Sequence, residues 1–430
     1  MDLYELTALL LTVAAFFSYA NHRWLKLPTT IGLMVIALIA SSVIIILGNF
    51  YPAVEHLGRA IIERVNFDDT LMNGMLGLLL FAGALHINVN DLAQNKWIIA
   101  LLASVGVILS TLIVGLVAWL LLGALGIPNS FIYCLLFGAL ISPTDPIAVL
   151  GILKYAGAPK SLETKITGES LFNDGIAVVV FLGLLQIATG EHGFDIGHLA
   201  TLFVEEAIGG AIFGLVIGFL AYQMLKSVDN YQVEVLISIA VAAGGYALAN
   251  HFHLSGPIAM VVAGLLIGNH GRSLAMSPKT VEHLDMFWEL MDEILNAVLF
   301  VLIGLELLVL PLSRVLIIAG VCLFPLIVLA RLISVGLPVR LLRSRRTFTV
   351  HVVKVLTWGG LRGGISVALA LSIPSNLDGI PVQERDPIVV ITYAIVVLSI
   401  IGQGLTIGPL IRRLFANTKV HDEAASSIST

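Results

Sequence analysis

Charged side chains are rare in this sequence. Lysine, arginine, aspartate and glutamate together supply 12% of the 430 residues, while 58% are hydrophobic. A soluble domain carries about 25% charged residues. This composition therefore excludes a soluble globular protein and predicts a chain that lies in a lipid bilayer. The net charge of −5 provides no basic surface, so no nucleic-acid partner is expected.

Cysteine and catalytic motifs are also scarce. Cys134 and Cys322 both lie inside apolar stretches, which predicts free thiols and no disulfide. The sequence has no HExxH zinc motif, P-loop or GxSxG nucleophile elbow, so neither an enzyme nor a bound cofactor is expected. Histidines such as His283 and His351 lie mostly at the ends of apolar stretches, where an ordinary interfacial role competes with tuning of a pH response.

Long apolar stretches, in contrast, are abundant. A window of about 20 residues, the length of a spanning helix, finds thirteen candidate spans, and no leader cleavage site precedes the first, which we expect to be retained. The spans are Leu3 to Ala20, Thr30 to Leu47, Thr70 to Ile87, Trp97 to Leu122, Phe131 to Leu153, Ile166 to Thr189, Leu202 to Leu225, Val233 to Asn250, Pro257 to Asn269, Asp292 to Val309, Val315 to Pro338, Val352 to Ile373 and Pro387 to Pro409. The predicted fold is an all-α integral membrane protein with about 13 transmembrane helices.

Two of the connections between spans are amphipathic. These are "EHLGRAIIERV" within 48–69 and "VEHLDMFWELM" within 271–291. Both are predicted to form short helices at the membrane surface. The residues after the last span are too few to fold alone, so 410–430 is expected to be a short tail on a single transmembrane domain that covers 1–430.

The basic residues predict an orientation, because lysine and arginine favour cytoplasmic loops. With the amino terminus outside, 16 of the 23 basic residues fall in cytoplasmic segments, four in outer loops and three within spans. Loss of one span would destroy this bias. We therefore predict a multi-pass protein of the cell (inner) membrane with its amino terminus outside and its tail, 410–430, in the cytoplasm.

Few charged residues lie within the predicted spans, and each is costly in a bilayer without a partner. They are Asp145, Glu169, Asp174, Glu306, Arg331, Lys354 and Arg362. We expect these residues to meet one another, because pairing lowers that cost.

The sixth span, "ITGESLFNDGIAVVVF", has two polar faces. Ser170 and Asp174 are four residues apart and share one face of a helix, and Glu169 and Asn173 form a second pair about 100° around it. A solvated helix end is the plainer alternative. The mostly apolar sequence on both sides of these residues argues against it.

Two other spans are interrupted. The fifth contains "ALISPTDPIAVLG" with Pro143 and Pro146, and in the twelfth, "VLTWGGLRGGISVALAL", four glycines surround Arg362. Proline and clustered glycine loosen a helix and free its carbonyls. Spans 5 and 12 run in opposite directions, which fits an inverted-repeat transporter whose irregular backbone lines a site at the midplane. Close helix packing is the alternative for the glycines alone.

Four motifs carry a resemblance to a known family. They are "SPTDP" (142–146), "GESLFNDG" (168–175), "LARL" around Arg331 and "GGLRGG" (359–364). With them the chain resembles the monovalent cation:proton antiporters of the NhaP and sodium/proton exchanger type over nearly its whole length. The resemblance implies the NhaA/NhaP-like fold of two inverted six-helix repeats with helices 5 and 12 broken, assembled as a homodimer. It also implies a moving ion-carrying bundle (97–189 and 315–409) and a mainly dimerising scaffold (1–95 and 200–309).

The resemblance also implies a binding site for the transported cation. Asp174 matches the aspartate that binds the cation and exchanges the proton, and Asn173 matches the asparagine paired with it. Asp145, Ser170 and the backbone carbonyl of Thr144 match other ligands or neighbours of Na+. The implied substrates are H+ and Na+, or alternatively Li+ or K+.

Further residues match supporting positions in this family. Glu169 looks like a buried glutamate paired with Arg331, and Arg362 like an arginine that offsets the partial charge of carbonyls freed by the broken helices. One position departs from the pattern. Many relatives have a carboxylate in the third helix where this chain has Ala82, which leaves the preference among cations open.

A mechanism follows from the physical chemistry of a buried acid. A carboxylate among apolar helices holds a proton more readily than one in water, and a nearby carboxylate strengthens this. A cation that is offered oxygen ligands can replace that proton, so the two would compete for Asp174 during alternating access. Because Asn173 is not an acid and Glu169 is expected to pair with Arg331, we expect electroneutral 1:1 exchange.

Two other classes remain as alternatives. A cation channel would use the same carboxylates, but it would not need two oppositely oriented broken helices. An anion or carboxylate transporter could bind its substrate at half-helix amino ends and at Arg362. The acids at 145, 169 and 174 argue against a negatively charged ligand.

Overall fold

The computed structural model describes residues 3–415 except for 66, 147–148, 151–152, 154–157, 191–196, 198–200, 202–203, 344–350 and 378–379. Some predicted features lie outside the described residues. These are most of the tail, from 416 onward, and Lys154, Arg345 and Arg346 among the predicted cytoplasmic charges.

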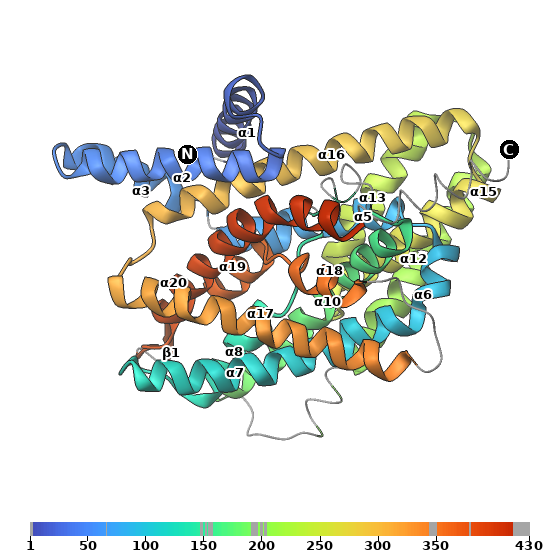
Figure 1. Cartoon of the computed structure of the whole chain (residues 1–430). Helices are drawn as coiled ribbons and strands as arrows, with labels where there is room; N and C mark the ends of the chain where they lie inside the picture. Colours follow the sequence, from blue (N-terminus) through green and yellow to red (C-terminus); the bar gives the residue numbers. More distant parts are fainter. Residues whose placement is uncertain are drawn as a thin grey trace, which may run out of the picture.

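Helices make up nearly all of the described chain (Figure 1). The α-helices are α1 (Leu3–Ala20), α2 (Thr29–Gly48), α3 (Pro52–Glu63), α4 (Phe67–Asp69), α5 (Leu76–Leu85), α6 (Val89–Leu101), α7 (Val107–Ala124), α8 (Phe131–Ile141), α10 (Lys160–Ala188), α12 (Gly209–Ser227), α13 (Tyr231–His251), α14 (Gly256–Leu266), α15 (Arg272–Leu274), α16 (Pro278–Leu305), α17 (Arg314–Leu342), α18 (Val352–Trp358), α19 (Gly364–Leu371) and α20 (Arg385–Leu398). The π-helical segments are η1 (Asn21–Leu25), η2 (Thr70–Met75), η3 (Leu102–Gly106), η4 (Val204–Ile208), η5 (Ile267–Gly271) and η7 (Ser399–Gln403), and η6 (Glu306–Leu308) is a 3-10 turn. Two short strands, β1 (Asn376–Leu377) and β2 (Ile380–Pro381), pair antiparallel.

Several of these helices are long enough to cross a bilayer. Within the described part of the chain, seven helical stretches have the required length and apolar composition. They are Thr29–Gly48, Val89–Ala124, Lys160–Ala188, Val204–Ser227, Tyr231–His251, Arg314–Leu342 and Arg385–Phe415. The prediction of a helical, multi-pass membrane protein is therefore confirmed.

The fifth and twelfth predicted spans are interrupted in the structure. α8 ends at Ile141, just before Pro143, which has no backbone N–H to continue the helix. α18 ends at Trp358, and α19 begins only at Gly364. We call the intervening residues, 142–145 and 359–363, the crossing segments. They pair antiparallel, because the backbone amide of Asp145 donates to the carbonyl of Leu361 over 2.8 Å.

One of the two predicted surface helices is not a separate element. The stretch around "EHLGRAIIERV" does form a short helix, α3, but "VEHLDMFWELM" is the first part of the long helix α16. Leu284 and Trp288 of this stretch are fully buried. Trp288 packs against Phe81 of α5 with the rings tilted and their centroids 4.9 Å apart, and its indole N–H donates to the Ser238 hydroxyl over 2.9 Å. The prediction was wrong because the apolar side of this amphipathic helix packs on protein.

The helices around the crossing segments form two hydrophobic clusters. The larger one joins α2, α7, α8, α17, α19 and α20, and the smaller one joins α5, α13, α14 and the first half of α16. α10 packs against α8 on one side and against α14 on the other. Figure 1 shows α16 along one edge of the molecule and α7 and α17 along the opposite edge, with α10, α18 and α19 between them. The crossing segments therefore lie deep inside the protein.

We predict that Gly363→Ala destabilises the protein, because the two crossing segments touch at this residue. A Cβ atom at 363 would lie 2.7 Å from Cβ of Asp145, and such overpacking costs about 1 to 3 kcal/mol. Thermal unfolding in detergent should show a lower midpoint than for wild type. Gly244→Ala is the control, because a Cβ atom there meets nothing within 4 Å, and it should be neutral or slightly stabilising. Equal midpoints for the two variants would contradict the close approach.

Candidate functional site

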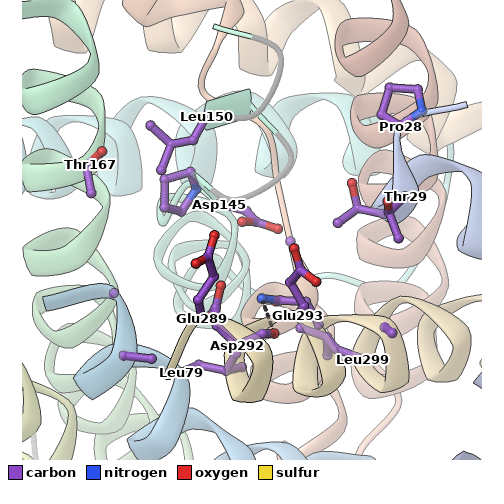
Figure 2. A pocket seen from close by; sticks show the side chains of 18 of the residues that line it. Pro28, Thr29, Leu79, Asp145, Leu150, Thr167, Glu289, Asp292, Glu293 and Leu299 are labelled. Atoms are coloured by element: carbon purple, nitrogen blue, oxygen red, sulfur yellow. Dashed lines mark hydrogen bonds between the residues drawn. The ribbon is translucent and has the colours of Figure 1, made fainter. Parts of the chain in front are cut away.

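A cavity of about 1750 Å³ leads from the surface to the crossing segments. Its walls come from α2, α5, α10, α16 and α19, and its lining includes Asp145 and Asp174. Figure 2 shows the Asp145 carboxylate in this space, facing Glu289, Asp292 and Glu293 of α16. The two aspartates that the sequence predicted for one site therefore face the same cavity.

α10 supplies four of the predicted site residues from one unbroken helix. Pro159 precedes its first turn, where a proline is tolerated, and the helix then continues to Ala188. The four residues are Glu169, Ser170, Asn173 and Asp174, and each is at most 6% exposed. Charged and polar groups buried this deeply need partners, and for three of them the crossing segments and α17 provide these partners.

Thr144 joins α10 to the first crossing segment. Its hydroxyl lies 3.0 Å from the Ser170 hydroxyl and accepts a hydrogen bond from the Asn173 amide nitrogen, also over 3.0 Å. The Asn173 amide oxygen accepts from the Thr144 backbone N–H over 3.5 Å. Both ends of the Asn173 side chain therefore hold Thr144, whereas sequence reasoning had grouped Asn173 with the cation-binding residues.

Asp174 lies one turn along α10 from Ser170, on the same helix face. Its side chain lines the cavity, as does that of Asp145. Two carboxylates in one buried space repel each other unless a proton or a cation reduces their charge. Ser170 and the first crossing segment place oxygen atoms beside them, and oxygen is the ligand atom that hard cations prefer.

Glu169 and Arg331 form a buried ion pair on the other face of α10. The guanidinium Nη1 of Arg331 lies 2.5 Å from Oε1 of Glu169, without the angle of a directed hydrogen bond. Their side chains are 1% and 6% exposed. Arg331 also touches the second crossing segment, since a Cβ atom at Gly360 would lie 2.8 Å from its Nε. This pair therefore ties α10 to α17 behind the cavity.

Arg362 reaches from the second crossing segment to the first. Its Nη1 donates to the carbonyls of Ser142 and Pro143 over 2.7 and 3.0 Å, and its backbone N–H donates to the Ser399 hydroxyl over 3.0 Å. Carbonyls at the end of a helix lack partners in the helix and carry partial negative charge. The buried guanidinium group of Arg362 donates hydrogen bonds to these carbonyls and offsets their partial negative charge.

Two charged positions singled out in the sequence lie apart from this cluster. The expectation that all intramembrane charges meet was wrong for Lys354, which is exposed on α18. It was also wrong for Glu306, which follows the end of α16 and lies about 20 Å along that helix from Asp292, given a rise of about 1.5 Å per residue. Ala82 is buried and lines the cavity.

Sequence reasoning missed the contribution of α16 to the cavity. Glu289, Asp292, Glu293 and Asn296 all line it. Their stretch fell at the boundary between a predicted surface helix and a predicted span, where acids are ordinarily solvated. The spacing of Asp292 and Asn296, four residues apart, was the available signal for a shared polar face.

Interrupted helices that pair inside the protein, with buried acids beside a cavity, are typical of membrane transporters. The family model "Sodium/hydrogen exchanger, transmembrane" matches residues 11–413. The Na+/H+ antiporter NhaP of Pseudomonas aeruginosa is 50% identical over 420 residues, which are 96% of this chain and 97% of that protein. The Na+/H+ antiporter NhaH of Halobacillus dabanensis is 36% identical over 94% of this chain and 96% of that protein.

A solved structure shares the fold. The sodium proton antiporter MjNhaP1 from Methanocaldococcus jannaschii superimposes with a TM-score of 0.75 at 18% identity, over 96% of this chain and 99% of that one. The chain therefore belongs to the sodium/hydrogen exchanger family of transmembrane antiporters.

We predict strong coupling between Glu169 and Arg331 in stability. Removing one partner of a buried ion pair leaves the other charge uncompensated and costs about 3 to 5 kcal/mol, whereas removing both is milder. Glu169→Gln and Arg331→Gln should each lower the thermal midpoint in detergent, and the double variant should lose much less than the sum. The surface pair of exposed Lys160 and half-buried Asp91, 3.1 Å apart, provides a control cycle with coupling below about 1 kcal/mol. Additive losses in the Glu169–Arg331 cycle would contradict the pairing.

Proposed function

We propose that this protein exchanges Na+ for H+ across the cell (inner) membrane, with Asp174 as the group that holds either ion. The observation that carries the proposal is the position of Asp174. It is 6% exposed, lines the cavity and lies one helical turn from Ser170, whose hydroxyl contacts Thr144 in the first crossing segment. Asp145, Ser170 and the Thr144 carbonyl are the proposed further ligands or neighbours of Na+, with Li+ or K+ as alternative cargo.

Competition between proton and cation follows from this environment. Burial disfavours the charged carboxylate, so the site gains by holding a proton or a cation. The hydroxyl and backbone oxygens replace part of the hydration shell of Na+ when the proton leaves. If the protein changes its open side only when one of the two ions is bound, the two gradients alone drive exchange.

Supporting residues hold the site without binding the ion in this proposal. Asn173 positions Thr144 through both atoms of its amide group. Glu169 is neutralised by Arg331, and Arg362 compensates the free carbonyls of Ser142 and Pro143. We propose that Asp174 is the group that gains and loses the proton, because Asn173 is not an acid and Glu169 is paired with Arg331, and this supports a 1:1 electroneutral cycle.

Alternating access requires one part of the molecule to move against another. We propose that 97–189 and 315–409, which contain both crossing segments, form the moving bundle, and that 1–95 and 200–309 form a scaffold that dimerises. In this proposal the chain has thirteen spanning helices in two inverted repeats, with its amino terminus outside. The cavity lining includes Lys26, Lys160 and Arg412, which are all predicted to be cytoplasmic, so the described state is open to the inside.

The first functional prediction is that Asp174→Asn abolishes exchange while the protein still inserts and folds. The amide cannot alternate between proton and cation. Na+-driven proton movement in proteoliposomes, followed with a pH-sensitive dye, should fall to the level of protein-free vesicles. Asp386→Asn makes the same chemical change at a side chain that is 61% exposed and should exchange at the wild-type rate. Normal proton movement with Asp174→Asn would contradict the proposal that Asp174 holds the transported ions.

The second functional prediction concerns charge movement. One proton against one Na+ transfers no net charge, so the rate should not change when a potassium diffusion potential of either sign is imposed with valinomycin. A potential-sensitive dye should report no signal during turnover in vesicles without an ionophore. A sustained potential that follows the Na+ gradient would show that a second group is titrated, and Glu169 would be the first residue to examine.

A further inference from the structure

α16 presents a row of polar side chains to the cavity, opposite α10. Glu289, Asp292, Glu293 and Asn296 belong to it. In Figure 2 the first three side chains extend from α16 into the space that Asp145 enters from the crossing segment. None of the four belongs to the proposed Asp174 site, so the cavity contains a second polar surface.

One face of α16 is fixed against the half-helix α19. Asp292, Asn296 and Leu299 are spaced by four and three residues, so they lie on one side of the helix. Leu299 packs at the start of α19, because a Cβ atom at Gly364 would lie 2.6 Å from Leu299 Cδ1. Next to it, a Cβ atom at Gly363 would lie 2.7 Å from Asp145. These contacts place this face of α16, through Leu299, at the start of α19 and next to the crossing segments.

Two buried oxygen atoms on these helices have no hydrogen-bond partner in the described chain. Asn296 is 3% exposed, and its amide nitrogen donates to the Asp292 carbonyl over 2.7 Å, which leaves its Oδ1 unbonded. Ser366 of α19 is 1% exposed, and its Oγ is likewise unbonded. Both residues line the cavity. A buried polar atom without a partner is unfavourable, so these atoms favour a bound species.

We propose that Asp292, Asn296 and Ser366 form a second subsite for a monovalent cation, which the ion occupies between the cavity entrance and Asp174. This inference rests on the proposed exchange of Na+ for H+. A carboxylate, an amide oxygen and a hydroxyl are the oxygen ligands that a hard cation accepts. A single carboxylate balances one positive charge, which matches a monovalent ion.

The subsite also explains how a cation approaches a site that is held by carboxylates. Asp292 and Asp145 face the same space. A cation at Asp292 exchanges part of its water shell for protein oxygens before it reaches Ser170 and Thr144. Dehydration then proceeds in two smaller steps, and the local Na+ concentration near Asp174 is raised.

The test measures the Na+ dependence of proton movement in proteoliposomes that contain the full chain. Asp292→Asn should raise the KM for Na+ about five- to tenfold and leave the maximum rate within twofold of wild type, because Asp174 remains intact. Glu293→Gln is the matched control. It removes one charge from the neighbouring position, where the side chain is exposed to the cavity, and its KM should stay within twofold of wild type.

Neutral variants separate a subsite with ligands from a general effect of charge. Ser366→Ala and Asn296→Ala keep the net charge, and each should raise the KM for Na+ at least threefold if its oxygen binds the ion. An increase with Asp292→Asn alone would mean that the acid acts only through its field, and it would overturn the subsite. So would a loss of maximum rate at unchanged KM.

The outcomes also distinguish the two proposals. Wild-type exchange together with an unchanged KM in Asp292→Asn, Asn296→Ala and Ser366→Ala would overturn the subsite alone. Absence of Na+-driven proton movement in the wild type would overturn the proposed function and the subsite with it.

Discussion

The carbonyl groups at the end of α8 impose the constraint on which the rest of the site depends. Pro143 prevents the helix from continuing, so the oxygens of Ser142 and Pro143 face the protein interior without helical partners. Arg362 binds both oxygens, and the Asp145 amide is satisfied by the carbonyl of Leu361. The second interrupted helix therefore donates hydrogen bonds to the free carbonyls of the first, and the first donates one to a carbonyl of the second. Neither interruption would be stable alone in a membrane.

The hydrogen bonds between the two crossing segments determine where the polar groups of the candidate site lie. Once the first crossing segment is fixed, Thr144 meets Ser170 and Asn173 on α10, and Asp174 follows one turn further along the same face. The ion pair of Glu169 and Arg331 holds a second face of α10, about 100° around the helix, to α17. A frame of paired polar groups thus surrounds two carboxylates that face the cavity, which is the kind of support that the proposed ion site requires.

These contacts explain why the crossing segments contain residues that would destabilise an isolated helix. Glycine and proline weaken helices, and buried charges cost free energy. At Gly360 and Gly363 a side chain would collide with Arg331 or Asp145, so the absence of Cβ allows the crossing to close. Glycine, proline and buried charges are therefore tolerated in the crossing segments, because contacts with the surrounding helices compensate their unfavourable local free energy.

The sequence by itself determined the membrane class, the two interruptions and the grouping of the polar residues on α10, because each depends on composition or on the fixed geometry of one helix. It could not determine which helix faces which. The continuity of α16, the hold of Asn173 on Thr144 and the donation from Arg362 to Ser142 depend on contacts between segments far apart in the chain. The polar face of α16 became visible only when tertiary packing turned it toward the cavity, since in the sequence the same acids resemble an ordinary solvated helix surface.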